Sequence, residues 1–443
     1  MRSRGSLQGG RGFRAQSARM DNLTHSLIGF VAGDAIARST ADVPGGLSAA
    51  TRRSYFVTVA AIGSNIPDLD LLLTYGGFAP GKLGYLLHHR GHTHTIVGCV
   101  VLALLLYGCA ELWARLAKDR FSRSDRLGIL GMALLGALLH LLMDGLNSYG
   151  VHPYWPFDNG WVYGDSVFII EPLYWLAAAP LIFTVRTWFA RIVLSLAALA
   201  AVGIGLYLNR EQPLWVAGIV LVALALLIAG KRSSPRTVAL VSISAMFAIT
   251  AVLVVAGRAT AREVASFAAT MFPNDETIDH VLTPLPTNPL CWDVLLIQTG
   301  GGQYTVRHGV VAIAPSILPA ANCPRLGLGE HTSAPMTPVP APSSARVQWV
   351  GEFTMSQAAL ASIVDGNCEA SELMQFARAP FAMEREQRHV LGDLRFDRGP
   401  ELGFAEIELS DPPPQRCQFH VPWIPPRLSL LRSLQRTGEA PGS

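Results

Sequence analysis

Histidine and aspartate residues are concentrated in four short segments near the start of this chain. Seven of its twelve histidines lie between His25 and His152. The four segments cover residues 21–26, 67–70, 88–95 and 140–147. Imidazole and carboxylate donors together suit zinc, manganese or iron better than calcium or magnesium. The segments therefore predict a divalent-metal site, with zinc as the first expectation and manganese or iron as alternatives.

The spacing inside these segments favours convergence on one site. His140 and Asp144 are four positions apart, so both project from the same face of a helix. Asp68 and Asp70 follow Pro67, which interrupts the helical hydrogen-bond ladder close to a helix end. The number of donors makes a two-metal site feasible. The alternative is a proton-relay or transport network built from the same residues without a metal.

Long apolar segments carry these residues. Of 443 residues, 50% are hydrophobic and only 15% are charged, with a mean hydropathy of +0.32. Soluble domains have about 25% charged residues, and a spanning helix needs about 20 mostly apolar ones. Eight membrane spans are expected, at residues 22–37, 55–74, 95–114, 127–146, 167–185, 190–208, 213–230 and 237–256. The net charge of +3 and the lack of a basic stripe argue against a nucleic-acid partner.

Lysine and arginine residues predict the orientation of these spans. They are concentrated in alternate connections, which the positive-inside rule assigns to the cytoplasm. All four His/Asp segments then fall at the outer membrane surface, and the chain after Arg258 lies outside. The Arg-rich N-terminus conflicts with this topology. Either residues 22–37 are not a full span, or translation starts at Met20, which is the preferred explanation.

Cysteine usage supports the same topology. Cys99 and Cys109 lie in an apolar segment, and the other four fall in the region assigned outside, namely Cys291, Cys323, Cys368 and Cys417. An even number of cysteines in an extracytoplasmic domain favours two disulfides, for which three pairings are possible. Four unpaired thiols are the alternative.

The expected fold is an all-α polytopic helical bundle of about eight spans, followed by a smaller extracytoplasmic α+β domain. The predicted organisation is an N-terminal extension (1–19) that is disordered or precedes the true start, a four-helix metal-site region (20–166), further transmembrane helices (167–257), the α+β domain (258–427) and a disordered tail (428–443). Within that domain, strands are expected at residues 292–298, 304–313, 345–353 and 389–396, and helices at 355–364 and 369–377.

The motifs resemble those of a known family. The segment Met20-Asp21-Asn22-Leu23-Thr24-His25-Ser26 and the later Pro67–Asp70, His89–Thr95 and His140–Gly150 motifs are similar, in the same order, to those of the YdjM-type family. These are LexA-regulated inner-membrane proteins assigned as metal-dependent hydrolases. The motif order is more distantly similar to that of zinc-dependent phospholipase C enzymes, which implies phosphoester cleavage. The resemblance covers roughly residues 20–310.

The resemblance implies roles for individual residues. The implied metal ligands are His25, Asp68, His94, His140 and Asp144, and Asp70 belongs to the same motif as Asp68. His89, Arg90 and His92 are implied as further ligands or as groups supporting them.

Two of the expected catalytic residues also have a chemical argument of their own. Arg90, beside four histidines, can hold an anionic substrate group, because a guanidinium matches phosphate or carboxylate oxygens. Glu171, at the outer end of the fifth span, can cap or orient a ligand, or act as a base. Together with His92, they make up the expected catalytic residues, namely Arg90, His92 and Glu171.

The favoured interpretation is a multi-pass metal-dependent hydrolase of the cell inner membrane. Metal-activated water would attack an ester or phosphoester of a membrane-associated substrate, and a lipid-linked substrate is the natural expectation. The alternatives are a transporter or ion-coupled carrier that uses the same His and Asp residues, and a structural metal beneath a partner-binding outer domain. A carrier would need polar groups along its spans, where only Asp34 and Asn65 stand out.

Overall fold

The computed structural model describes residues 11–41, 44–75, 77–324, 332–397, 399–414 and 416–427. Residues 1–10 of the expected extension and the expected tail 428–443 lie outside the described residues. The chain folds as two compact units. One comprises residues up to Pro67, Cys99–Met143 and Ile169–Ile249, and the other comprises Asp68–Gly98, Asp144–Phe168 and residues from Thr250 onward. The loops that carry most of the candidate site therefore belong to the same unit as the C-terminal domain.

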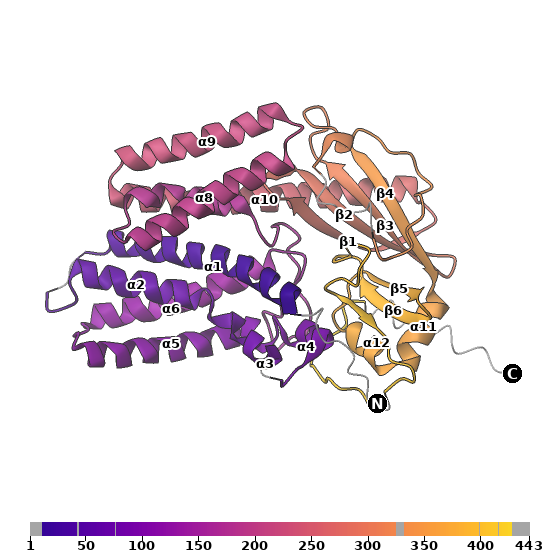
Figure 1. Ribbon diagram of the computed structural model, residues 1–443, viewed down its shortest axis with the longest axis horizontal. Coiled ribbons are helices and arrows are strands. Elements are labelled where there is room, and N and C mark those ends of the chain that lie inside the picture. The colour runs from indigo at the N-terminus through magenta and orange to yellow at the C-terminus, as the bar shows by residue number, and fades with distance from the viewer. Residues whose placement is uncertain are drawn as a thin grey trace, which may run out of the picture. The chain divides into compact units, whose positions relative to one another are not determined.

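Long helices dominate the N-terminal part of the chain (Figure 1). They are α1 (Arg11–Ser39), α2 (Ala49–Gly63), α5 (Ile96–Ala117), α6 (Arg123–Gly145), α8 (Trp188–Leu208), α9 (Pro213–Arg232) and α10 (Pro235–Met271). Shorter elements are η1 (Ile66–Asp70), α3 (Leu71–Tyr75), α4 (Gly81–His88), η2 (His92–His94), α7 (Pro172–Ala178) and η3 (Ala179–Phe183). The candidate ligands outside α1 and α6 fall on or beside the short elements.

Five described helices are long and apolar enough to cross a membrane, namely α5, α6, α8, α9 and α10. They coincide with five of the expected spans. The expected span 55–74 is not one helix, because α2 ends at Gly63 and Pro67 lies in the 3₁₀ turn that follows. The expected span 167–185 is divided between a loop, α7 and η3, and the expected domain boundary at 258 falls inside α10.

Glycines allow α2 to pack closely between α1 and α6. A Cβ atom added at Gly29 would lie 2.5 Å from the carbonyl oxygen of Ala60, and one at Gly33 would lie 2.7 Å from that of Phe56. From α6, a Cβ at Gly136 would lie 2.6 Å from the same Ala60 oxygen and 2.8 Å from Ser64 N. Small residues spaced in this way permit the close backbone contact by which helices associate in membranes.

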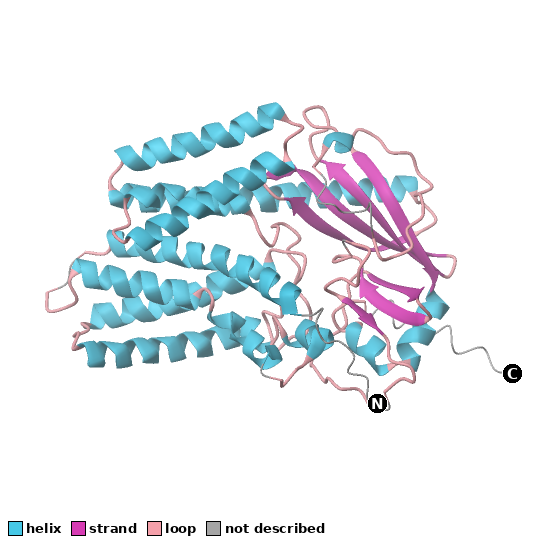
Figure 2. Ribbon diagram, viewed as in Figure 1, coloured by secondary structure: helices cyan, strands magenta, loops and turns pink. Residues whose placement is uncertain are grey.

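The C-terminal domain contains two antiparallel sheets (Figure 2). The first has the order β1 (Glu276–Leu285), β2 (Asn288–Gly300), β3 (Gln303–Ala312) and β4 (Val347–Ser356). The second has the order β5 (Pro380–Arg385), β6 (Arg388–Asp393) and β7 (Glu406–Glu408), and α11 (Gln357–Gly366) and α12 (Cys368–Leu373) complete the domain. The expected strands and helices thus coincide with β2, β3, β4, β6, α11 and α12.

Side-chain alternation along β2 explains how the first sheet is covered. Val294 and Leu296 pack in a core with Val264 and Ala268 of α10 and with Phe272, which follows that helix. Leu295 and Ile297 point to the opposite face and pack in a second core with residues of α11 and α12. Two disulfides, Cys291–Cys323 and Cys368–Cys417, confirm the expected pair of bridges and select one of the three pairings.

Candidate metal centre

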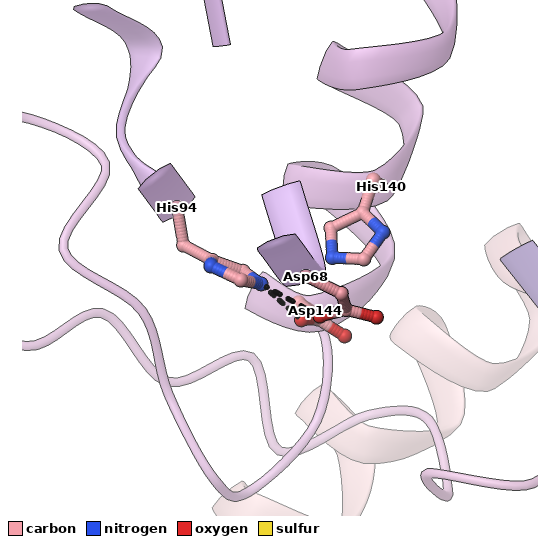
Figure 3. Close-up of side chains that lie close together, drawn as sticks. All are labelled: Asp68, His94, His140 and Asp144. Carbon is pink, nitrogen blue, oxygen red and sulfur yellow. Dashed lines mark ion pairs between the residues drawn. The ribbon is translucent and has the colours of Figure 1, made fainter. Parts of the chain in front are cut away.

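Four polar side chains from three chain segments come together at the C-terminal end of α6. Asp68 lies in η1 and His94 in η2, while His140 and Asp144 are one turn apart on α6. One potential ligand atom from each residue lies within 4.8 Å of the others. His94, His140 and Asp144 are buried and Asp68 is partly buried. Figure 3 shows the four side chains converging.

The donor chemistry of this group fits a metal ion. His94 Nε2 lies 3.4 Å from an oxygen of Asp68 and 3.2 Å from an oxygen of Asp144 (Figure 3). Two imidazoles and two carboxylates form a four-ligand set of the kind that zinc and related ions accept. Buried carboxylates need a compensating positive charge, which a divalent cation would supply.

Asp70 lies behind His94. One oxygen of its carboxylate is 3.2 Å from His94 Nδ1, and this oxygen also accepts hydrogen bonds from Arg90 N (2.9 Å) and Thr93 Oγ1 (2.9 Å). The other oxygen is 3.0 Å from His89 Nδ1. Burial would raise the pKa of Asp70, but the two histidines outweigh it and hold this pKa well below its usual range. A carboxylate on the far nitrogen of a metal-binding histidine fixes its tautomer and ring orientation.

His89 and Asp70 also belong to a second group. One ligand atom from each of Asp68, Asp70 and His89 lies within 4.8 Å of the others. Asp68 is shared between the two groups, so it could bridge two ions. The structure thus brings together six of the seven expected ligands, divided between two adjoining groups.

Arg90 is a buried partner of Asp144. Its side chain is 1% exposed, with Nη2 2.8 Å from the carboxylate of Asp144 and Nη1 donating to Asn147 Oδ1 at 3.0 Å. The guanidinium also lies over the Tyr149 ring, 4.6 Å from its centroid. Arg90 has a left-handed backbone (φ 62°), which aims its N–H at Asp70 while its side chain reaches Asp144.

The seventh expected ligand, His25, lies beside His140 but in neither of the two groups found among the described residues. The two imidazole rings are stacked, with centroids 4.0 Å apart. Ser64 links them, because its Oγ donates to His25 O and its carbonyl oxygen lies 2.9 Å from His140 Nδ1. These contacts direct His140 Nε2 away from α2.

His92 and Glu171, the other two expected catalytic residues, are also outside both groups. His92 is exposed, and its ring lies between Trp155 (centroids 4.6 Å apart) and Trp423 (4.9 Å). Glu171 is buried and caps α7 by accepting a hydrogen bond from Leu173 N at 3.1 Å. The described contact of its carboxylate is thus a helix cap, a role that was not predicted from the sequence.

Several residues around the site were not predicted from the sequence. Asn147 and Tyr149 belong to the His140–Gly150 motif, but nothing in the sequence indicated that they contact Arg90. Trp423 is distant in sequence, yet its Nε1 donates to Leu87 O at 2.9 Å and its ring stacks on His152 with centroids 3.9 Å apart. No local pattern marks Trp423, so only the tertiary structure could reveal it.

Comparison with known proteins finds one family to which the N-terminal part of the chain is similar. Residues 20–213 match the family model described as YdjM inner membrane protein. The resemblance expected from the four motifs is thus confirmed over this segment, which contains all the candidate ligands. No curated protein and no solved structure matches the chain.

Proposed function

We propose that this chain is a membrane-embedded metal-dependent hydrolase that cleaves an ester or phosphoester of a membrane-associated substrate. The observation that carries the proposal is the buried convergence of Asp68, His94, His140 and Asp144. Ionisable groups at membrane-embedded positions are costly and usually functional. Zinc fits this ligand set best, and manganese or iron is the alternative.

The chain's own residues have separable tasks in this proposal. The four converging side chains would hold the ion, which when bound lowers the pKa of its water so that hydroxide is available near neutral pH. Asp70 orients His94, and Arg90 fixes Asp144. His92 is the exposed expected catalytic residue and is proposed to contact the substrate. Glu171 is proposed to act structurally, through its cap on α7.

The proposed topology places the site at the outer surface of the inner membrane. In it, α1, α2 and the α7–η3 segment join the five long helices as about eight spans, and the C-terminal domain lies outside. The two disulfides support this side, because disulfides persist in oxidising compartments.

The substrate is proposed to be lipid-borne. Pro153 O accepts a hydrogen bond from Ile96 N at the start of α5, which ties the 153–157 loop to the end of a membrane helix. Tyr154 and Phe157 in this loop are 54% and 90% exposed. Exposed aromatic rings at the end of a span are typical of the membrane–water interface.

A carrier function has less support. Asp34 is paired with Arg38 (2.8 Å) and with Arg53, and Asn65 donates to Ser26 Oγ and Ala61 O. The two polar residues expected along a carrier pathway therefore have local structural partners.

The proposal is tested with the full chain in lipid vesicles containing a fluorescent phospholipid or a fluorescent carboxylic-ester lipid. We expect hydrolysis that chelation abolishes and zinc or manganese restores, and that Asp144→Asn eliminates. Asp158→Asn, an exposed aspartate in the following loop, is the matched control and should keep full activity. Hydrolysis that survives complete metal removal would contradict the proposal.

A further inference from the structure

We infer that the C-terminal domain is part of the metal centre, and that Arg395 is a positioning residue for the ligand Asp144. This inference rests on the proposed function. The inference goes beyond the proposed function because Arg395 lies outside the 20–213 segment that matches the family. Every contact in the argument lies within one compact unit.

Arg395 is rigidly held inside the C-terminal domain. Its side chain is 1% exposed, and Asp393, which is fully buried, accepts from both Nε (2.9 Å) and Nη2 (2.7 Å). Nη2 also donates to Phe376 O at 2.9 Å. Because Nε and Nη2 both donate to one oxygen of this buried carboxylate in a charge-assisted pair, the direction of the remaining guanidinium nitrogen is fixed.

That remaining nitrogen points at the loop that follows α6. Arg395 Nη1 donates to Ser148 O at 2.7 Å and to Tyr149 O at 3.2 Å. Buried carbonyl groups need hydrogen-bond partners, and charge-assisted bonds to them are strong. Arg395 therefore satisfies and fixes the two carbonyls that follow Asn147.

The loop in turn holds the ligand. Asn147 Oδ1 accepts from Tyr149 N at 2.9 Å and from Arg90 Nη1 at 3.0 Å, and Arg90 Nη2 lies 2.8 Å from Asp144. A series of hydrogen bonds and ion pairs, continued through the Ser148–Tyr149 peptide group, thus connects Asp393 to Asp144. Groups that orient a metal ligand typically change metal affinity by about 10–100-fold when removed.

A second contact from the same domain reaches the His94 side of the site. Trp423 Nε1 donates to Leu87 O, and a Cβ added at Gly91 would lie 3.1 Å from the Trp423 ring. The C-terminal domain thus contacts the segment that precedes His94 and the loop that follows Asp144.

The test measures Co²⁺ binding to detergent-purified full chain by its visible spectrum, which reports coordination geometry. We expect Arg395→Met to weaken Co²⁺ affinity about 10–100-fold and to change the spectrum. Arg395→Lys, which keeps the charge without the fork, should fall between Arg395→Met and wild type. The matched control is Arg388→Met, because Arg388 pairs with Glu408 (2.7 Å) on the exposed surface of the sheet whose strand β6 ends at Asp393. It should bind Co²⁺ like wild type.

A double-mutant cycle separates positioning from a general loss of stability. If Arg395 acts through Asn147, then Asn147→Ala combined with Arg395→Met should bind Co²⁺ no more weakly than the weaker-binding single variant. Multiplicative losses would overturn the inference, as would wild-type affinity and spectrum in Arg395→Met, and either result leaves the proposed hydrolase standing. Wild-type protein that binds no metal at all would overturn both.

Discussion

At the scale of single residues, His152 makes the region around the site sensitive to acid. Its buried ring packs against Trp161 and Trp423, with centroids 3.9 Å from each. Burial lowers the pKa of His152 to about 3, from 6.5 for an exposed imidazole. Between pH 6.5 and about 3 only the unfolded chain binds a proton at His152. The free energy of unfolding therefore decreases as pH falls below 6.5, by about 1.4 kcal/mol per pH unit.

This effect is measured as the decrease in the melting temperature of metal-free protein between about pH 7.5 and about pH 5.5. His152→Gln should show a smaller acid-induced decrease than wild type, because the substituted residue does not titrate. His420→Gln removes an exposed histidine and should behave like wild type. An equal decrease in all three proteins would contradict the assignment.

At the scale of elements, the close packing of α2 and α6 places His140. Gly136→Val would drive a side chain into the backbone of Ala60 and Ser64, whereas Gly131 on the same helix has no atom within 4 Å of an added Cβ. We expect Gly136→Val to destabilise the protein by about 1–3 kcal/mol and to weaken metal binding, and Gly131→Val to do neither. Thermal melting and metal titration of the two variants check this, and equal behaviour would refute it.

The sequence predicts elements well where a local pattern dominates. Apolar length predicts α5, α6, α8 and α9, and side-chain alternation predicts β2 and β3. The prediction of one helix over residues 55–74 was wrong. The apolar run is continuous in sequence, but α2 ends at Gly63 and Pro67 lies in the 3₁₀ turn that follows.

The candidate site is predictable only in part. The predicted topology placed the four His/Asp segments at one membrane surface, and the family resemblance implied Asp68, His94, His140 and Asp144 as ligands. The sequence could not show that Arg90 forms an ion pair with Asp144, nor that Trp423 reaches the site. Both facts depend on contacts between segments that are distant in sequence.

At the scale of the whole molecule, the account requires the C-terminal domain to face the oxidising side of the membrane. A protease added to spheroplasts should then digest this domain, and inside-out vesicles should protect it. Alkylation of unreduced, denatured protein should label Cys99 and Cys109 alone, because the other four cysteines form disulfides. Protection in spheroplasts with labelling of all six thiols would contradict the topology.

The central claim is that the buried His/Asp group binds a metal ion, and metal content measures it most directly. Protein purified without added metal should contain one or two equivalents of zinc, manganese or iron per chain. His140→Ala and Asp144→Ala should lose it, while Asp158→Asn retains it. Wild-type protein that is folded, has both disulfides and contains no stoichiometric metal, even after incubation with zinc, would contradict the account.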